Sequence, residues 1–161
     1  MRTTFFFVRA LVLLFVLCPP LAGAANDAQY LDQLFERSTL QIATPDARLH
    51  NLKIWIADDD ARRARGLMFV EHLDEDAGML FIYPQPQTIA MWMKNTRIPL
   101  DMVFVRPDGR VESVVANTVP MSLKTIRSKG EVLAVIELNA GSAARMKIGP
   151  GAQVIHQAFP R

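Results

Sequence analysis

The stretch LDMVFVRPDGRVESVVA, residues 100–116, predicts the clearest hairpin in the chain. Apolar residues dominate both of its arms. The PDG sequence at residues 107–109 is typical of a tight turn, because proline presets φ and glycine accepts a positive φ. Two such arms joined by a short turn pair as antiparallel strands. A β-sheet is therefore the expected framework of the fold.

Other segments are expected to add strands to this sheet. Residues 52–57, LKIWIA, alternate Leu and Ile with Lys and Trp, which predicts a half-buried strand. Residues 131–138, EVLAVIEL, form a nearly continuous apolar run, which predicts a central strand. Further strands are expected at residues 38–44, 78–83, 88–94 and 153–159.

Short helices are expected between the strands. One follows a candidate N-cap at Asn26 or Asp27, and Ser142 is the candidate cap of a single helical turn. Residues 58–65 begin with acids and end with arginine before Gly66, as a short helix does. We therefore predict an α+β, β-rich domain: a compact curled sheet or barrel-like core of about seven strands with two or three short helices.

Residues 1–24 have the layout of a secretory signal peptide. Arg2 gives a positive start, an apolar run follows, and small residues precede the expected cleavage after Ala24. Residues 25–37 are then expected to form an N-terminal arm or short helix, and residues 38–161 a single domain. The expected location is the periplasm or the medium. The alternative is an uncleaved N-terminus that anchors the protein in the inner membrane.

Removal of the signal peptide changes the chemistry of the chain. Arg2 and Arg9 leave with it, so the formal net charge of +2 falls to about zero and nucleic-acid binding loses its electrostatic support. Cys18, the only cysteine, also leaves, so no disulfide and no thiol nucleophile is expected. No nucleotide-binding glycine motif is present, and no cofactor is expected. The expected partner is an unknown small molecule or periplasmic protein, with no stable membrane span after cleavage.

The segment MWMKNTRIP, residues 91–99, places polar side chains directly before the hairpin. If residues 88–94 pair with residues 100–105, Lys94 and Asp101 stand opposite each other, and an ion pair between them supports the connection. The second interpretation is a pocket for a small anionic or polar ligand. In that pocket Asp101 acts as an acid or base and a cation holds the anion. The candidate pocket residues are Arg65, Trp92, Lys94, Asn95, Thr96 and Asp101.

Methionines allow a third interpretation. Met91 and Met93 share one face of the expected strand, and thioethers are soft ligands that suit Cu(I). Methionine also fills gaps in apolar cores, and the set lacks a close histidine or cysteine partner. We therefore expect no metal site and keep Met91 and Met93 as the alternative.

Three segments occur together as they do in a known family. RGLMFVEHLDEDAGMLFIY (residues 65–83), MWMKNTRIPLDMVFVRPDGRV (91–111) and VIELNAG (135–141) resemble the DUF192 family, also called the uncharacterised ACR family. The resemblance runs from about Leu40 to the C-terminus and implies a compact β-rich domain, often behind a signal peptide, without an established biochemical role. Many relatives carry Cys, Pro or Tyr in the loop after the hairpin. Here residues 118–130 have no Cys or Tyr, so roles resting on those side chains are not transferred.

These observations favour an exported small-ligand- or partner-binding module over an enzyme. The first alternative is an enzyme that acts on a small polar or anionic substrate through Lys94 and Asp101, and the second is a methionine-based Cu(I) carrier. An enzyme needs Asp101 and a basic residue at an accessible cavity. The exposure of Lys94 and Asp101 therefore separates the binding module from the enzyme.

Overall fold

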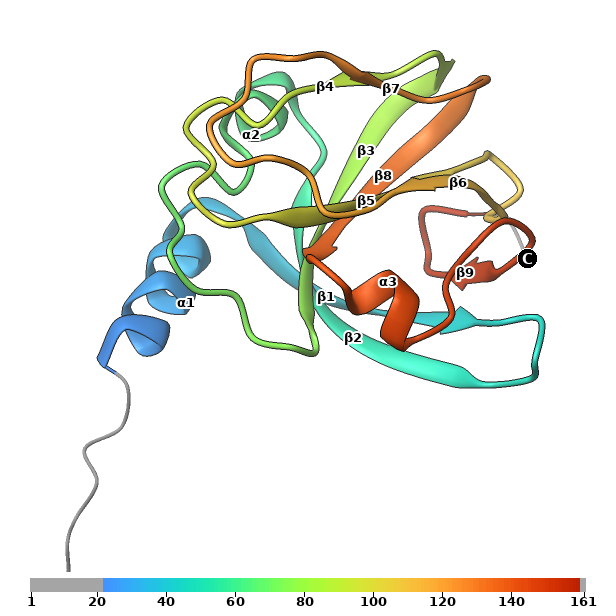
Figure 1. The fold of residues 1–161 in the computed structure, drawn as a ribbon, viewed down its shortest axis with the longest axis horizontal. Coiled ribbons are helices and arrows are strands. Elements are labelled where there is room, and N and C mark those ends of the chain that lie inside the picture. The colour runs from blue at the N-terminus through green and yellow to red at the C-terminus, as the bar shows by residue number, and fades with distance from the viewer. Residues whose placement is uncertain (1–21, 160–161) are drawn as a thin grey trace, which may run out of the picture.

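A seven-stranded sheet curls into a nearly closed barrel in the computed structural model, which describes residues 22–159 (Figure 1). Its strands, in spatial order, are β6 (Val111–Val115), β5 (Leu100–Val105), β8 (Val132–Asn139), β3 (Ala77–Gln87), β2 (Leu49–Ala57), β1 (Glu36–Ala43) and β9 (Gln153–Ile155). A separate pair is formed by β4 (Ala90–Met91) and β7 (Ile126–Arg127). The helices are α1 (Ala22–Leu34), α2 (Asp60–Arg65) and α3 (Ser142–Arg145). The expected β-rich fold is confirmed.

Antiparallel pairing dominates the sheet, and the two ends of the sheet meet. The expected hairpin is present as β5 and β6, and the apolar run at residues 132–139 is the central strand β8, between β5 and β3. Only β2 and β3 are parallel, and the connection between them contains α2. The amide of Val111 donates to Ala152 and the amide of Val154 donates to Gly109, each at 2.8 Å, which brings β6 beside β9.

Each strand divides its side chains between two apolar layers, because successive side chains point to opposite faces of a sheet. On β5, Val103 and Val105 point into the barrel, whereas Met102 and Phe104 point outward. The outer layer is covered by α1, by the loop after α2 and by the segments that carry β4 and β7 (Figure 1). Burial of each large side chain contributes about 1.5–3 kcal/mol, so the outer cover is an integral part of the fold.

The expected strand at residues 88–94 is wrong in extent and in partner. Only Ala90 and Met91 are in β4, which pairs with β7, whereas β5 pairs with β6 and β8. Ile89 and Met93 are buried in the outer layer. The alternation of apolar residues in this segment therefore comes from a loop that covers the sheet rather than from a strand inside it.

Two smaller expectations also need correction, and a third lies outside the described residues. β3 does not end at Pro84 but runs to Gln87, with an irregular register after Ile82 that accommodates the prolines. α1 begins before Asn26 and Asp27, so neither caps it. Residues 1–21 lie outside the described part of the chain, and most of the expected signal peptide falls there.

Candidate functional site

Three of the six candidate pocket residues line one cleft on the outer side of the barrel. Arg65 ends α2, while Trp92 and Lys94 follow β4, and these segments face each other across a volume of about 210 Å³. Tyr83 of β3 and Glu137 of β8 also line the cleft. The cleft therefore lies between the sheet and two segments of its outer cover.

The end of α2 sets the position of Arg65. The carboxylate of Asp59 accepts a hydrogen bond of 2.7 Å from the amide of Arg62 and caps the helix start. Gly66 ends the helix with a φ of 46° and passes close over the sheet, since a Cβ there would lie 3.0 Å from Phe81 Cζ. The glycine thus lets the chain descend onto β3 directly after Arg65.

Aromatic rings hold the cations at this cleft. The Arg65 guanidinium lies 5.2 Å from the ring centre of Tyr30 and 4.7 Å from that of Phe69. Burial lowers the pKa of Arg65, and no ion pair joins its guanidinium group to a carboxylate within the described residues. Lys94 Nζ lies 5.6 Å from the ring centre of Trp92, which is 53% exposed.

Asp101 lies on the other side of the sheet from Lys94. Its side chain is fully buried, and its two oxygens accept hydrogen bonds of 2.9 Å from the amides of Asn117 and Ala143. The expected ion pair between Lys94 and Asp101 is therefore not formed. The strand alternation explains this outcome, because Asp101 follows Val103 into the barrel whereas Lys94 is exposed in the outer cover. The expected cap Ser142 is the first residue of α3 and not its cap, and the Asp101 carboxylate accepts the hydrogen bond from the Ala143 amide at the start of this helix.

Asn95 and Thr96 tie the outer loops together instead of facing the cleft. Asn95 has a φ of 56°, and its carbonyl accepts a hydrogen bond of 2.9 Å from the amide of Phe69. The carbonyl of Thr96 accepts one of 3.0 Å from the amide of Met121, and the Thr96 side chain is buried. The backbone of these two residues therefore connects the segment before β5 to the loop after α2 and to the loop after β6.

Glu137 also lines the cleft, although it is not among the six candidate pocket residues predicted from the sequence. It is 4% exposed and lies between Met79 of β3 and Met102 of β5 on the outer face of the sheet. No donor of the described residues forms a hydrogen bond or ion pair with its carboxyl group. Burial raises the pKa of Glu137 to about 8. The one signal in the sequence was the acid at position 137, which lies between apolar residues of the run 131–138.

This arrangement suits an anion with an apolar body. Near neutral pH a carboxyl group with a pKa of about 8 is mostly protonated, so Glu137 can donate a hydrogen bond. Arg65 and Lys94 supply positive charge at the cleft, and Trp92 supplies an apolar surface. The two conditions for holding a small anion, a buried donor and nearby cations, therefore occur together.

The two candidate metal ligands serve different contacts. The sulfur of Met91 accepts a hydrogen bond from the Tyr83 hydroxyl at 3.5 Å, and that of Met93 accepts one from the Thr118 hydroxyl at 3.2 Å. Within residues 22–159, no three side chains of His, Cys, Asp or Glu come together as a metal site would require. Each thioether therefore contacts a hydroxyl group, and the Cu(I) alternative at Met91 and Met93 stays a prediction.

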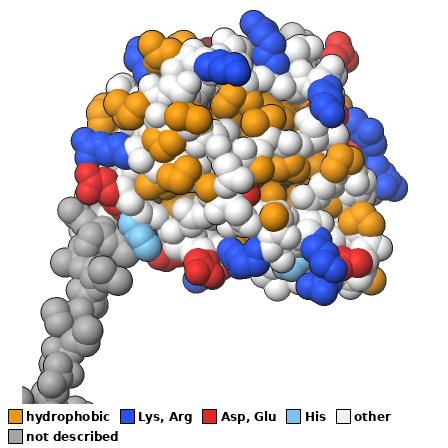
Figure 2. Space-filling view, in the orientation of Figure 1, with side chains coloured by type: hydrophobic (Ala, Val, Ile, Leu, Met, Phe, Trp, Pro, Cys, Tyr) orange, Lys and Arg blue, Asp and Glu red, His pale blue; other side chains and the backbone are white. Residues whose placement is uncertain are grey.

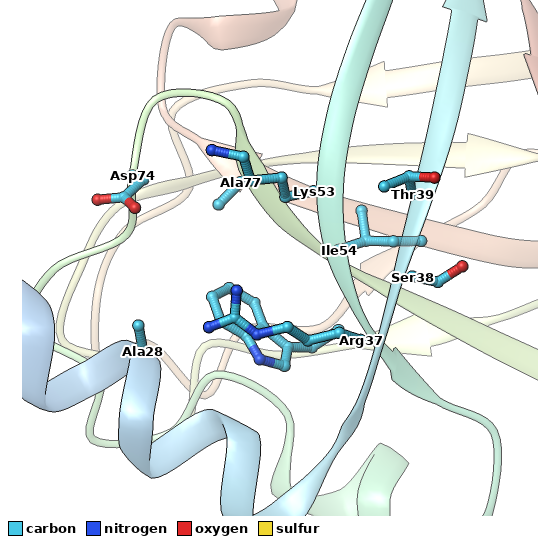
Figure 3. A pocket seen from close by; sticks show the side chains of 9 residues that line it. Ala28, Arg37, Ser38, Thr39, Lys53, Ile54, Asp74 and Ala77 are labelled. Carbon is cyan, nitrogen blue, oxygen red and sulfur yellow. The ribbon is translucent and has the colours of Figure 1, made fainter.

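A larger cleft, of about 410 Å³, lies between α1 and the barrel (Figure 3). Arg37, Lys53 and Trp55 line it, and the Arg37 guanidinium lies over the Trp55 ring. Its charges are already paired: Asp32 accepts from Arg37 and from the indole N–H of Trp55, and Lys53 pairs with Asp76 at 2.9 Å. This cleft is larger than the one above Glu137, but the Glu137 carboxyl group has no hydrogen-bond partner among the described residues, and we take the smaller cleft as the candidate site.

Comparisons with known proteins agree with this fold. The model of the DUF192 family, described as uncharacterized ACR, matches residues 41–156, and the chain belongs to this family. A crystal structure of a protein from Sinorhizobium meliloti 1021, described as a proposed transcription regulator, is similar with a TM-score of 0.76 and 35% identity, covering 78% of this chain and 97% of that one.

A second crystal structure, of a protein of unknown function from Novosphingobium aromaticivorans, is similar with a TM-score of 0.73 and 36% identity. That match covers 76% of this chain and 86% of the other. A comparison with curated proteins finds no match. The family and the fold are thus established, and the function has to be argued from the site.

Proposed function

We propose that this protein is an exported small-ligand-binding module whose site is the cleft above Glu137. The observation that carries the proposal is the carboxyl group of Glu137, which is buried, has no hydrogen-bond partner within the described residues and lines a cleft. A ligand in the cleft can bond to this carboxyl group, because no described residue occupies its hydrogen-bonding positions.

The ligand class follows from the charges. Arg63, Arg65 and Lys94 line the cleft, and Glu137 is the one acid among its lining residues. With Glu137 protonated, the cleft favours a small organic anion, such as a carboxylate or a phosphate ester with an apolar body. The leader-like sequence of residues 1–24 supports export.

The geometry does not support the alternative enzyme, which needs Lys94 and Asp101 at one site. Lys94 is exposed in the outer cover, whereas Asp101 is buried in the barrel with both oxygens bonded to backbone amides. No substrate can contact both side chains. Ligand binding without a Lys94–Asp101 reaction is therefore the function that the geometry supports best.

Titration of the purified protein with a panel of aliphatic and aromatic carboxylates and phosphate monoesters tests this proposal. We expect at least one to bind, and its affinity to fall by about tenfold or more as pH rises through the pKa of Glu137, because the ionised carboxylate repels an anion. Glu137→Ala and Lys94→Ala should each weaken binding.

Lys124→Ala is the matched control, because Lys124 is an exposed lysine that does not line the cleft. Equal affinity in all three variants, or affinity that does not change with pH, would rule out this cleft as the site. A ligand that binds more tightly above the pKa of Glu137 would identify a cationic ligand and overturn the proposed class.

A further inference from the structure

Exposed apolar side chains gather on the loops of the outer cover. Five exposed large hydrophobic residues lie in three loops. We call these five residues the apolar edge: Phe69, Trp92, Val119, Met121 and Leu123. Val119 and Leu123 are 69% and 68% exposed, more than any other large hydrophobic residue of the described chain. A contiguous exposed group of this kind indicates an interaction surface.

Backbone hydrogen bonds join the three loops into one surface. The amide of Met93 donates to the carbonyl of Ser122 at 3.0 Å, beside Trp92 and Leu123. The bonds from Phe69 to Asn95 and from Met121 to Thr96 connect the other parts. The apolar edge is therefore a single built surface rather than a set of unrelated loop tips.

The backbone conformation of this surface is unfavourable for its residues. Phe69 has a φ of 68° and Met121 a φ of 60°, in the left-handed region that bulky side chains rarely adopt. Both side chains are exposed, 46% and 57%, so burial in the core does not compensate for the strain. Strain held by the surrounding structure is typical of functional sites. In the apolar edge, the strained backbone keeps the side chains of Phe69 and Met121 directed outward.

Two of the three loops of the apolar edge are positively charged, whereas the loop that carries Phe69 also contains the acid Glu71. Residues 88–100 and 117–130 contain five cations and no Asp or Glu: Lys94, Arg97, Lys124, Arg127 and Lys129. Arg97 pairs with Glu71, and the other four have no carboxylate within ion-pair distance among the described residues. Figure 2 shows Lys and Arg side chains along the upper edge of the molecule, beside hydrophobic ones.

We propose that the apolar edge docks the protein onto an anionic lipid surface. Tryptophan and other apolar side chains enter the headgroup region, while flanking Lys and Arg attract anionic headgroups. A protein partner fits less well, because protein interfaces are depleted in lysine, and three of the five cations are lysines. No helix of residues 22–159 is long and apolar enough to cross a membrane, and docking by the apolar edge needs none.

Vesicle binding tests the proposal with variants that lie outside the small-ligand cleft, because Trp92 and Lys94 belong to both surfaces. Sedimentation with phosphatidylcholine vesicles, with and without phosphatidylglycerol, should show binding that requires the anionic lipid and falls at high salt. Two double variants outside the cleft, Val119→Ser with Leu123→Ser and Lys124→Gln with Lys129→Gln, should each weaken binding by about tenfold. Leu49→Ser is the matched control, since Leu49 is 52% exposed at the start of β2.

Tryptophan emission provides a second readout. Trp55 is 5% exposed and Trp92 is 53% exposed, so a blue shift on vesicle addition reports the transfer of Trp92 out of water. Far-UV circular dichroism confirms that the variants remain folded. All variants share one N-terminus, so any contribution of the leader is the same in each.

Several outcomes overturn the proposal. They are equal loss in the Leu49→Ser control, binding that does not depend on phosphatidylglycerol, and absence of vesicle binding by the folded protein. Capture of an acidic protein or duplex DNA by the same edge, without vesicle binding, also overturns it. Loss of anion binding in the cleft with vesicle binding intact would refute only the proposed small-ligand function.

Discussion

Two buried carboxyl groups lie on neighbouring strands and face opposite sides of the same sheet. Asp101 of β5 points into the barrel and receives two backbone amides, whereas Glu137 of β8 points outward and receives no hydrogen bond from the described residues. Met102, the residue after Asp101, is the register partner of Glu137. Burial alone therefore does not mark a site. What separates the two acids is whether the fold itself provides their hydrogen bonds.

The largest effect is expected for Asp101→Ala. This variant leaves the amides of Asn117 and Ala143 without an acceptor, and each bond to a charged group contributes about 1.5–3 kcal/mol. We expect the free energy of unfolding to fall by about 3–5 kcal/mol in urea denaturation. Asp101→Asn, which keeps one acceptor, should lose about half as much. A loss below about 1 kcal/mol would show that Asp101 is not the structural acid of the pair.

A smaller, pH-dependent effect is expected for Glu137. Burial raises its pKa from the ordinary value of 4.5 to about 8, so between these values the folded state keeps a proton that the unfolded state releases. The free energy of unfolding should therefore fall by about 3 kcal/mol as pH rises from about 5 to about 8. Glu137→Gln should abolish this decline in denaturation curves recorded across that range. Glu131→Gln, at an exposed glutamate just before β8, should retain it.

The smallest effect is expected for Lys94→Ala. Lys94 is exposed and has no carboxylate within ion-pair distance among the described residues, so the melting temperature should change by no more than about 2 °C. The effects of Lys94→Ala and Asp101→Ala should add in the double variant, because the two side chains are not in contact. Recovery of stability in the double variant would instead indicate a coupled pair and would contradict the separation of the two faces.

Local patterns in the sequence predicted most of the fold. The hairpin of β5 and β6, the alternation in β2 and the apolar run of β8 each report a strand directly, because period and turn chemistry are local properties. The strand predicted at residues 88–94 is wrong in extent, because a loop that covers an apolar face also alternates apolar and polar side chains. Nothing in that segment distinguishes a strand in the sheet from a cover over it.

The site was predictable only in part. Arg65, Trp92 and Lys94 line one cleft, whose role as a site stays a prediction, and the partners of Asp101 are amides at residues 117 and 143, which only the folded chain brings near. Glu137 stood out in the sequence as an acid inside an apolar strand. Its lack of donors is a property of the folded surroundings, and sequence periodicity does not report it.

The closure of the barrel between β6 and β9 has a consequence for how the chain folds. Residues 41–43 of β1 pair with residues 153–155 of β9, so the last strand of the chain pairs with the first. Pairing between such distant segments has an entropic cost of loop closure, and topologies that depend on it fold slowly. Before β9 pairs with its neighbours, part of β1 and the free edge of β6 present unpaired backbone groups to other chains. The three residues of β9 therefore end the interval in which the nascent domain is most prone to intermolecular strand pairing.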